Sequence, residues 1–164
     1  VNNAGIISRK IFLEHSQKDW REQFQVNLFA ATQITQACFD QLKDNAPSSI
    51  INVSSSLAQR PIENCSAYSA SKAAMNSWTQ TLALEWAKYK ITVNAICPGI
   101  VNTPIHNLQQ HPEQASIEES MDQAHPLGRM GTAEEMAHNI LFLTSPASRW
   151  TTGSLKIIDG GISL

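Results

Sequence analysis

Hydrophobic and polar residues alternate along this chain with two different periods. Three short apolar runs rich in β-branched residues are typical of strands buried on both faces, and they lie at residues 50–53, 91–96 and 155–158. Elsewhere apolar residues recur every three to four positions, which predicts helices. These helices are expected over about 17–43, 67–88 and 133–143. Strands that alternate with helices favour a parallel sheet with crossover helices, so the pattern predicts an α/β fold.

The ends of these elements carry local signals. The sequences SQKD at 16–19 and TAEE at 132–135 have the form of capping boxes at helix starts. Ser66 is expected to cap the second helix, and the second strand is expected to stop at 97–99, because Pro and Gly break regular structure. Residues 1–6 have the pattern of a strand end followed by a turn.

Residues 104–126 differ from the rest of the chain. They are polar, include Pro104 and Pro112, and predict an exposed, partly helical insertion. Long insertions of this kind often cover a site. We therefore expect one domain over 1–164 with a lid at 104–126.

Composition narrows the possible classes of protein. Hydrophobic residues make up 42% of the chain and charged residues 16%, and the net charge is −2. A nucleic-acid partner is not expected, because phosphate contact needs a basic face. No apolar run reaches the roughly 18 residues of a membrane span, so no membrane partner is expected either. The chain has three cysteines, Cys38, Cys65 and Cys97. Because their number is odd and they lie far apart, they fit neither a disulfide framework nor a zinc site. A cytoplasmic location is therefore predicted.

The strongest local chemical signal is Tyr68 with Lys72. The two residues are four apart on an expected helix, so their side chains share a face. An ammonium near a phenol lowers the tyrosine pKa from about 10, which would make Tyr68 a usable acid or base. A solvated surface pair is the ordinary alternative.

Ser55 and Asn27 are further candidates. Ser55 follows the first strand, at the sheet edge where ligands bind in open α/β folds, although residues 54–56 also suit a simple polar turn. Asn27 lies in the middle of a helix that is otherwise apolar on one side, through Trp20, Phe24, Leu28, Ala31 and Ile34. Because Asn is a poor helix-interior residue, Asn27 indicates a local distortion or a bound water, or else an exposed position that tolerates it.

Several short motifs occur in a fixed order along the chain. They are NNAG at 2–5, Asn27, Ser55, Tyr68-x-x-x-Lys72 and PGIVNT at 98–103, followed by PLGR at 126–129, EE at 134–135, TG at 152–153 and DGG at 159–161. Together they resemble the classical short-chain dehydrogenase/reductase family over essentially the whole chain. The resemblance implies a Rossmann-like parallel sheet with flanking helices and an NAD(P)-dependent oxidoreductase that interconverts an alcohol and a ketone or aldehyde.

The resemblance also assigns roles to residues. It implies that Tyr68 is the catalytic acid or base, that Lys72 also binds the nicotinamide ribose, that Ser55 orients the substrate oxygen, and that Asn27 anchors a proton-relay water. Further cofactor contacts are implied for Asn3, Ala4, Gly5, Pro98, Gly99, Val101 and Thr103. No metal is expected, and the histidines at 106, 111 and 125 lack paired ligand spacing.

The glycines depart from the family pattern. None forms the Gly-rich first turn that binds a dinucleotide's diphosphate at a helix start. The sequence therefore suggests a partial chain that lacks the first βαβ units, on the order of 90 residues. It also leaves NAD and NADP undistinguished.

Other functions stay open at this point. One is a catalytically inactive fragment that acts as an interaction or assembly module. Another is a Ser–Lys hydrolase built on Ser55 and Lys72, which ranks far behind because no G-x-S-x-G elbow is present. Among oxidoreductases, reductases of 3-oxoacyl groups on an acyl carrier protein, sugar or polyol dehydrogenases and steroid-type enzymes all fit. A homodimer or homotetramer is expected through the helices at 17–43 and 67–88.

Overall fold

Three parallel strands form the central sheet of the computed structural model, which describes residues 1–106 and 113–164. The strands are β1 (Ser48–Val53), β2 (Ile91–Pro98) and β3 (Leu155–Ile158), in the spatial order β1-β2-β3. Ile50 lies opposite Val93, and Ala95 lies opposite Leu155. The predicted α/β class and the parallel sheet are confirmed.

The N-terminal segment adds to the sheet beside β1. The backbone nitrogen of Asn2 donates to the Ile51 carbonyl at 2.9 Å, and the nitrogen of Val53 donates to the Asn2 carbonyl at 2.9 Å. This is the pairing of a parallel strand over a single residue. It confirms the expectation of a strand end within residues 1–6, although no turn follows it there, and it places residues 3–5 at the carboxyl end of the sheet.

A buried chain of polar side chains fixes this segment in place. The Asn2 amide donates to Thr35 Oγ1 at 3.0 Å and to Asn52 Oδ1 at 2.8 Å, and the Asn52 amide donates to Thr79 Oγ1 at 2.8 Å. Asn52 and Thr79 are fully buried. Four elements of the chain therefore share one hydrogen-bond network.

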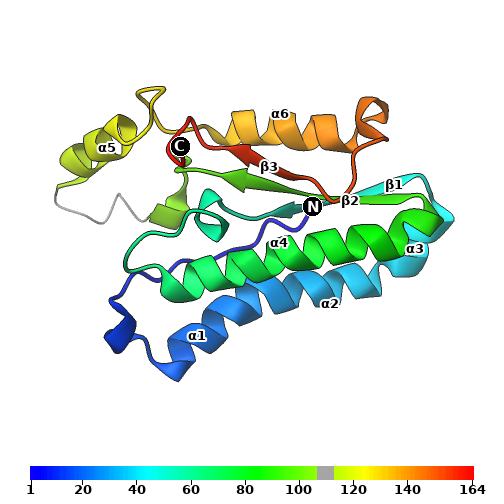
Figure 1. Cartoon of the computed structure of the whole chain (residues 1–164), viewed down its shortest axis with the longest axis horizontal. Coiled ribbons are helices and arrows are strands. Elements are labelled where there is room, and N and C mark those ends of the chain that lie inside the picture. The colour runs from blue at the N-terminus through cyan, green and yellow to red at the C-terminus, as the bar shows by residue number, and fades with distance from the viewer. Residues whose placement is uncertain (107–112) are drawn as a thin grey trace.

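Helices cover both faces of the sheet (Figure 1). One face carries α4 (Ser66–Trp86), with α1 (Gln17–Phe24), α2 (Ala30–Ala37) and α3 (Phe39–Asp44) beyond or beside it, and the other carries α6 (Ala133–Thr144). Each face has its own core. Ile50 and Val93 pack under α4, whereas Ile51 and Ile96 pack under α6. The short helix α5 (Gln114–Gln123) lies off the carboxyl ends of the strands.

The expected single helix over 17–43 is wrong in its continuity. A π-helical turn at Gln25–Phe29 separates α1 from α2, and Cys38 separates α2 from α3. The π turn contains Asn27, so the local distortion that this residue indicated is confirmed. The alternative of an exposed Asn27 is wrong, since its side chain is fully buried.

The predictions of the helix ends are correct in part. Both capping boxes are present, with Ser16 and Asp19 at α1 and with Thr132 and Glu135 at α6. The predicted cap at Ser66 is wrong. The helix starts at Ser66 itself, after Cys65, and no side chain caps it. It ends at Trp86, where a short 3₁₀ turn (Ala87–Tyr89) follows.

The second strand ends within 97–99, as the sequence predicts. Its last residue is Pro98, two positions beyond the apolar run at 91–96, because Cys97 and Pro98 pair with Ile157 and Ile158 of β3. Gly99 comes next, and its nitrogen donates to the Ile158 carbonyl at 3.1 Å. At this position the chain passes very close to Asp159. A Cβ on residue 99 would lie 2.8 Å from Asp159 Cβ and 2.9 Å from its Cα.

Replacing Gly99 with Ala is therefore expected to destabilise the fold by about 1–3 kcal/mol, since backbone at 2.9 Å cannot move aside without distorting the β2–β3 pair. Chemical denaturation measures this change. Gly131→Ala is the matched control, because there the nearest atoms to a Cβ lie at ordinary contact distances, 3.5 and 3.6 Å for two side-chain carbons and 3.7 Å for the Ile100 carbonyl oxygen. Equal effects of the two substitutions would contradict the packing explanation.

Candidate active site

The carboxyl ends of β1 and β2 bring the predicted site residues to one edge of the sheet. Ser55 follows β1 in extended backbone and opens the 3₁₀ turn Ser56–Ala58, where its hydroxyl accepts a hydrogen bond from the Leu57 nitrogen at 3.1 Å. Its side chain is buried. Ser55 is thus both part of a polar turn and positioned at the sheet edge.

Tyr68 and Lys72 lie in the first turns of α4 and are buried, with exposed fractions of 8% and 2%. They are not a solvated surface pair. Lys72 Nζ donates to the Val53 carbonyl at 2.7 Å and lies 5.9 Å from the centre of the Tyr68 ring. The end of β1 therefore fixes the ammonium beside the phenol.

Burial changes the protonation of both groups. It raises the pKa of Tyr68 above its ordinary value of 10, and a hydrogen bond with Ser55 and the charge of Arg9 only partly oppose the rise. The expectation that Lys72 lowers this pKa is wrong, because desolvation of the phenolate dominates. Burial also lowers the pKa of Lys72 from 10.5 to about 8.

A cavity of about 610 Å³ opens at this edge, between residues 3–7, the end of β1, the segment after β2, and α6. Ser55, Tyr68 and Lys72 line it. The expected cofactor-contact residues line it as well, and these are Asn3, Ala4, Gly5, Pro98, Gly99, Val101 and Thr103. Segments that lie far apart in the sequence thus meet around one space.

Asn27 is the one predicted site residue outside the lining of this cavity. Its Oδ1 accepts from the Ile6 nitrogen at 2.8 Å, and its Nδ2 donates to the Ile6 carbonyl at 3.0 Å and to Ser71 Oγ at 3.0 Å. The side chain therefore joins the loop at 5–7 to α4. Its contacts position the wall of the cavity.

A second cavity, of about 700 Å³, adjoins the first. The two share Ser55, Tyr68 and His106 among their walls. The second cavity continues under α5 and is also lined by Arg9 and Arg60. Sequence reasoning missed these two arginines, because neither belongs to a motif.

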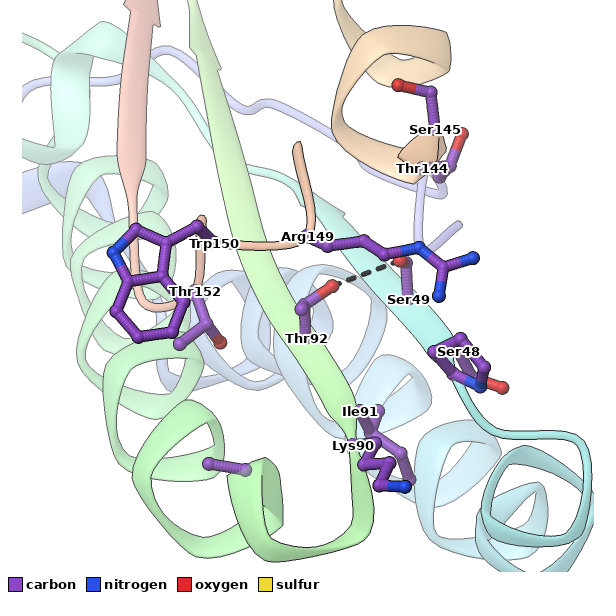
Figure 2. A pocket seen from close by; sticks show the side chains of 12 residues that line it. Ser48, Ser49, Lys90, Ile91, Thr92, Thr144, Ser145, Arg149, Trp150 and Thr152 are labelled. Atoms are coloured by element: carbon purple, nitrogen blue, oxygen red, sulfur yellow. Dashed lines mark hydrogen bonds between the residues drawn. The ribbon is translucent and has the colours of Figure 1, made fainter. Parts of the chain in front are cut away.

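A third cavity, of about 490 Å³, lies at the opposite, amino ends of β1 and β2. Figure 2 shows its hydroxyl-bearing residues, with Thr92 donating to Ser49 at 3.0 Å and Arg149 extending over the strand. None of the predicted site residues lies here. This separation makes Arg149 useful as a reference position below.

The histidines of the expected lid are placed in part. His106 lies between the two adjoining cavities, and burial lowers its pKa. His125 is buried and its ring nitrogen Nδ1 lies 2.7 Å from the Met121 carbonyl. His111 lies outside the described residues.

Within residues 1–106 and 113–164, no group of three or more His, Cys, Asp or Glu side chains could hold a metal ion. In the same part of the chain, no helix is both long and apolar enough to span a bilayer.

Comparison with known proteins assigns this chain to a family. The model of the family described as Enoyl-(Acyl carrier protein) reductase matches residues 1–163. The chain is 38% identical over 163 residues to the L-xylulose reductase of Bos taurus, with 98% of this chain and 66% of that protein covered. It is also 38% identical over 162 residues to the 3-oxoacyl-(acyl-carrier-protein) reductase FabG of Thermotoga maritima, with 99% and 64% covered.

Solved structures agree. The Cj0485 dehydrogenase superposes with a TM-score of 0.91 at 33% identity, with 98% of this chain and 63% of that chain covered. A short-chain dehydrogenase family protein from Francisella tularensis gives 0.89 at 28% identity, with 98% and 68% covered. The chain belongs to the short-chain dehydrogenase/reductase family. It spans 62–66% of the length of the curated relatives named here and of a tropinone reductase homolog from Arabidopsis thaliana.

Proposed function

We propose that this protein is an NAD(P)-dependent oxidoreductase that interconverts an alcohol and a ketone or aldehyde. The observation that carries the proposal is the position of Ser55 and Tyr68 at the boundary between two cavities, with Lys72 reaching only the first of them. Such a boundary suits a reaction between two bound molecules, one in each cavity.

The first cavity fits the nicotinamide and ribose part of a dinucleotide. Lys72 uses one of its donors on the Val53 carbonyl and has two left for ribose hydroxyls. Gly5 leaves the space beside the ammonium open, since a Cβ there would lie 3.5 Å from Lys72 Nζ and 3.6 Å from Asn27 Oδ1. The described residues hold no glycine-rich turn between a strand and a helix, so the proposal concerns the nicotinamide half of the site.

The residues of the chain handle the substrate oxygen. The bound nicotinamide supplies or accepts the hydride. Because burial raises its pKa, Tyr68 is a protonated phenol at neutral pH, which can donate a proton to a carbonyl oxygen that becomes an alcohol. Ser55, which lines both cavities together with Tyr68, would donate a second hydrogen bond and orient that oxygen. In this protonation state Tyr68 is suited to the step in which a carbonyl is reduced.

Asn27 would act by holding the loop that contains Gly5 against α4. The proposal also includes a proton-relay water bound by Asn27.

The alternative Ser–Lys hydrolase has no such support, because the Lys72 ammonium donates to the Val53 carbonyl and not to Ser55. Subunit pairing through α2 and α4 is also proposed. Exposed apolar side chains on these helices, Ile34 and Leu84, support it.

The test is carbonyl-dependent oxidation of NADH and NADPH by the full-length protein, followed by the loss of nicotinamide absorbance. Ser55→Ala is expected to lower kcat/KM by about 10²-fold, because one donor to the developing alkoxide is removed, while the cofactor Kd changes by less than about twofold. Ser69→Ala is the matched control, since Ser69 is a buried serine next to Tyr68 that lines neither adjoining cavity. Unchanged turnover in Ser55→Ala would contradict its role. Failure of the full-length protein to bind either nucleotide would favour the catalytically inactive module instead.

A further inference from the structure

The charged side chains that line the cavity beyond Ser55 and Tyr68 are all basic. Two of the chain's five arginines, Arg9 and Arg60, line it, and no Asp or Glu side chain is among its described walls. The adjoining cavity likewise has Lys72 and no acidic side chain. In a chain of net charge −2, such a concentration of positive charge needs an explanation.

Ion pairing within the protein does not explain why Arg9 and Arg60 lie together at this cavity. The neighbouring Lys10 is held by Asp19 at 2.8 Å, and Arg129 is held by Glu135 at 2.6 Å. In the part of the chain that the structure describes, neither Arg9 nor Arg60 forms an ion pair with a carboxylate, and residues 107–112 contain no acidic residue. Both arginine side chains are exposed, so neither has a packing role in the core.

The charge of Arg9 reaches the reacting end of the cavity. Its charge acts to lower the pKa of Tyr68 and of His106, two titratable groups at the boundary with the first cavity, although burial has the larger influence on both. A substrate whose carbonyl met Ser55 and Tyr68 would therefore extend into a positive field. Guanidinium groups bind carboxylates and phosphates through paired N–H donors, which makes them specific for planar or tetrahedral anions.

We propose that Arg9 and Arg60 bind an anionic group of the substrate, so that the substrate is an oxo acid or an oxo phosphate reduced to the hydroxy compound. This inference rests on the proposed function and specifies its substrate class. The carbonyl lies at Ser55 and Tyr68, and the carboxylate or phosphate lies between the arginines. Ser116 and Ser120 of α5 and His106 also line this cavity.

The experiment compares matched substrates in the full-length protein with NADH and NADPH. Levulinate and acetoacetate are compared with their methyl esters, and dihydroxyacetone phosphate with dihydroxyacetone. The charged member of at least one pair is expected to have a kcat/KM at least 10-fold higher. The carboxylate and phosphate pairs separate the two sources of negative charge. Equal rates for both members of every pair that is reduced would overturn the inference.

Arg9→Met and Arg60→Met keep an unbranched apolar stem and remove the guanidinium charge. Each is expected to lower kcat/KM for the charged substrate by about 10- to 100-fold and to leave the uncharged partner within about threefold. This ratio isolates anion binding, because a change in the acidity of Tyr68 alters both members equally. Arg149→Met, in the cavity at the opposite end of the strands, is the control and is expected to change neither. If Arg9→Met lowered kcat/KM equally for the charged and the uncharged substrate, Arg9 would act through the acidity of Tyr68 or through the stability of the fold. That result would overturn the inference.

A binding measurement separates this inference from the proposed function. Succinate and inorganic phosphate are each added to the protein without cofactor, and the midpoint of thermal unfolding is followed. At least one is expected to raise the midpoint in wild type and in Arg149→Met, but not in the Arg9→Met/Arg60→Met double variant. No stabilisation by either anion would overturn the inference. Stabilisation lost in the double variant, with no carbonyl compound reduced, would support the anion site while contradicting the oxidoreductase.

Discussion

Replacing Tyr68 by Phe is expected to lower turnover by about 10³-fold and to leave the cofactor Kd within about twofold. The substitution removes only the phenol oxygen, and proton transfer by a positioned side chain contributes about 10²–10⁴-fold. The ring remains packed in α4, where the side chain is 8% exposed. Steady-state kinetics and fluorescence titration of NAD(P)H measure the two effects separately.

Tyr89→Phe is the matched control for this experiment. Tyr89 lies beside Phe39 at the far end of α4, where its ring packs against the core under that helix. It therefore tests the loss of a phenol oxygen away from the site. Retained turnover in Tyr68→Phe would contradict the proposed chemistry. A parallel loss of cofactor binding would show that Tyr68 acts mainly through the structure of the cavity.

Replacing Lys72 by Met is expected to weaken cofactor binding by about 10- to 100-fold, because charged hydrogen bonds to ribose hydroxyls contribute about 1.5–3 kcal/mol. The same substitution is expected to stabilise the fold at pH 7. Lys72 is 2% exposed, and its pKa of about 8 in the folded state lies below its ordinary 10.5, so burying the charged form costs about 3 kcal/mol. Loss of the hydrogen bond to Val53 offsets about 1 kcal/mol of this gain.

The sign of the pH dependence follows from the depressed pKa. Below about pH 8 Lys72 is protonated in both the folded and the unfolded chain, and the variant is the more stable by about 2 kcal/mol. Between about pH 8 and 10.5 the folded protein releases the proton first, so the wild type gains stability relative to Lys72→Met. Denaturation of both proteins across this range measures the difference, in which other titrating groups cancel. A difference independent of pH would contradict the burial of a charged Lys72.

Much of this site could be predicted because its residues follow regular elements. Ser55 comes directly after a strand whose apolar run is unmistakable, and Tyr68 and Lys72 share a helix face by their spacing alone. Parallel strands place their carboxyl ends at one edge, so the order of the elements already brought these residues together. The protonation of Tyr68 could not be predicted in the same way. It depends on how deeply the ring is buried, which is a property of the packed molecule.

The helix over 17–43 shows why other details were missed. The expected apolar side included Ile34, yet Ile34 is 58% exposed and the buried row is Gln23, Asn27, Ala31 and Thr35. The π turn changes the phase of the helix, and three of these four residues are polar and bind other segments. Arg9 and Arg60 were missed for a different reason. They lie in irregular segments, and only the folded chain brings them to one cavity.

The network of Asn2, Thr35, Asn52 and Thr79 makes the alignment of the first residues all-or-none. Apolar contacts alone would allow residues 1–3 to shift along β1, because a shifted segment could still bury apolar surface. A shift by one position would instead leave the buried Asn52 side chain and the partly buried Asn2 amide without these partners, at about 1–3 kcal/mol for a buried unpaired group. The alternative alignments are therefore unpopulated. Asn3, Ala4 and Gly5 therefore reach the cavity wall in a single alignment, which is set by residues outside the cavity.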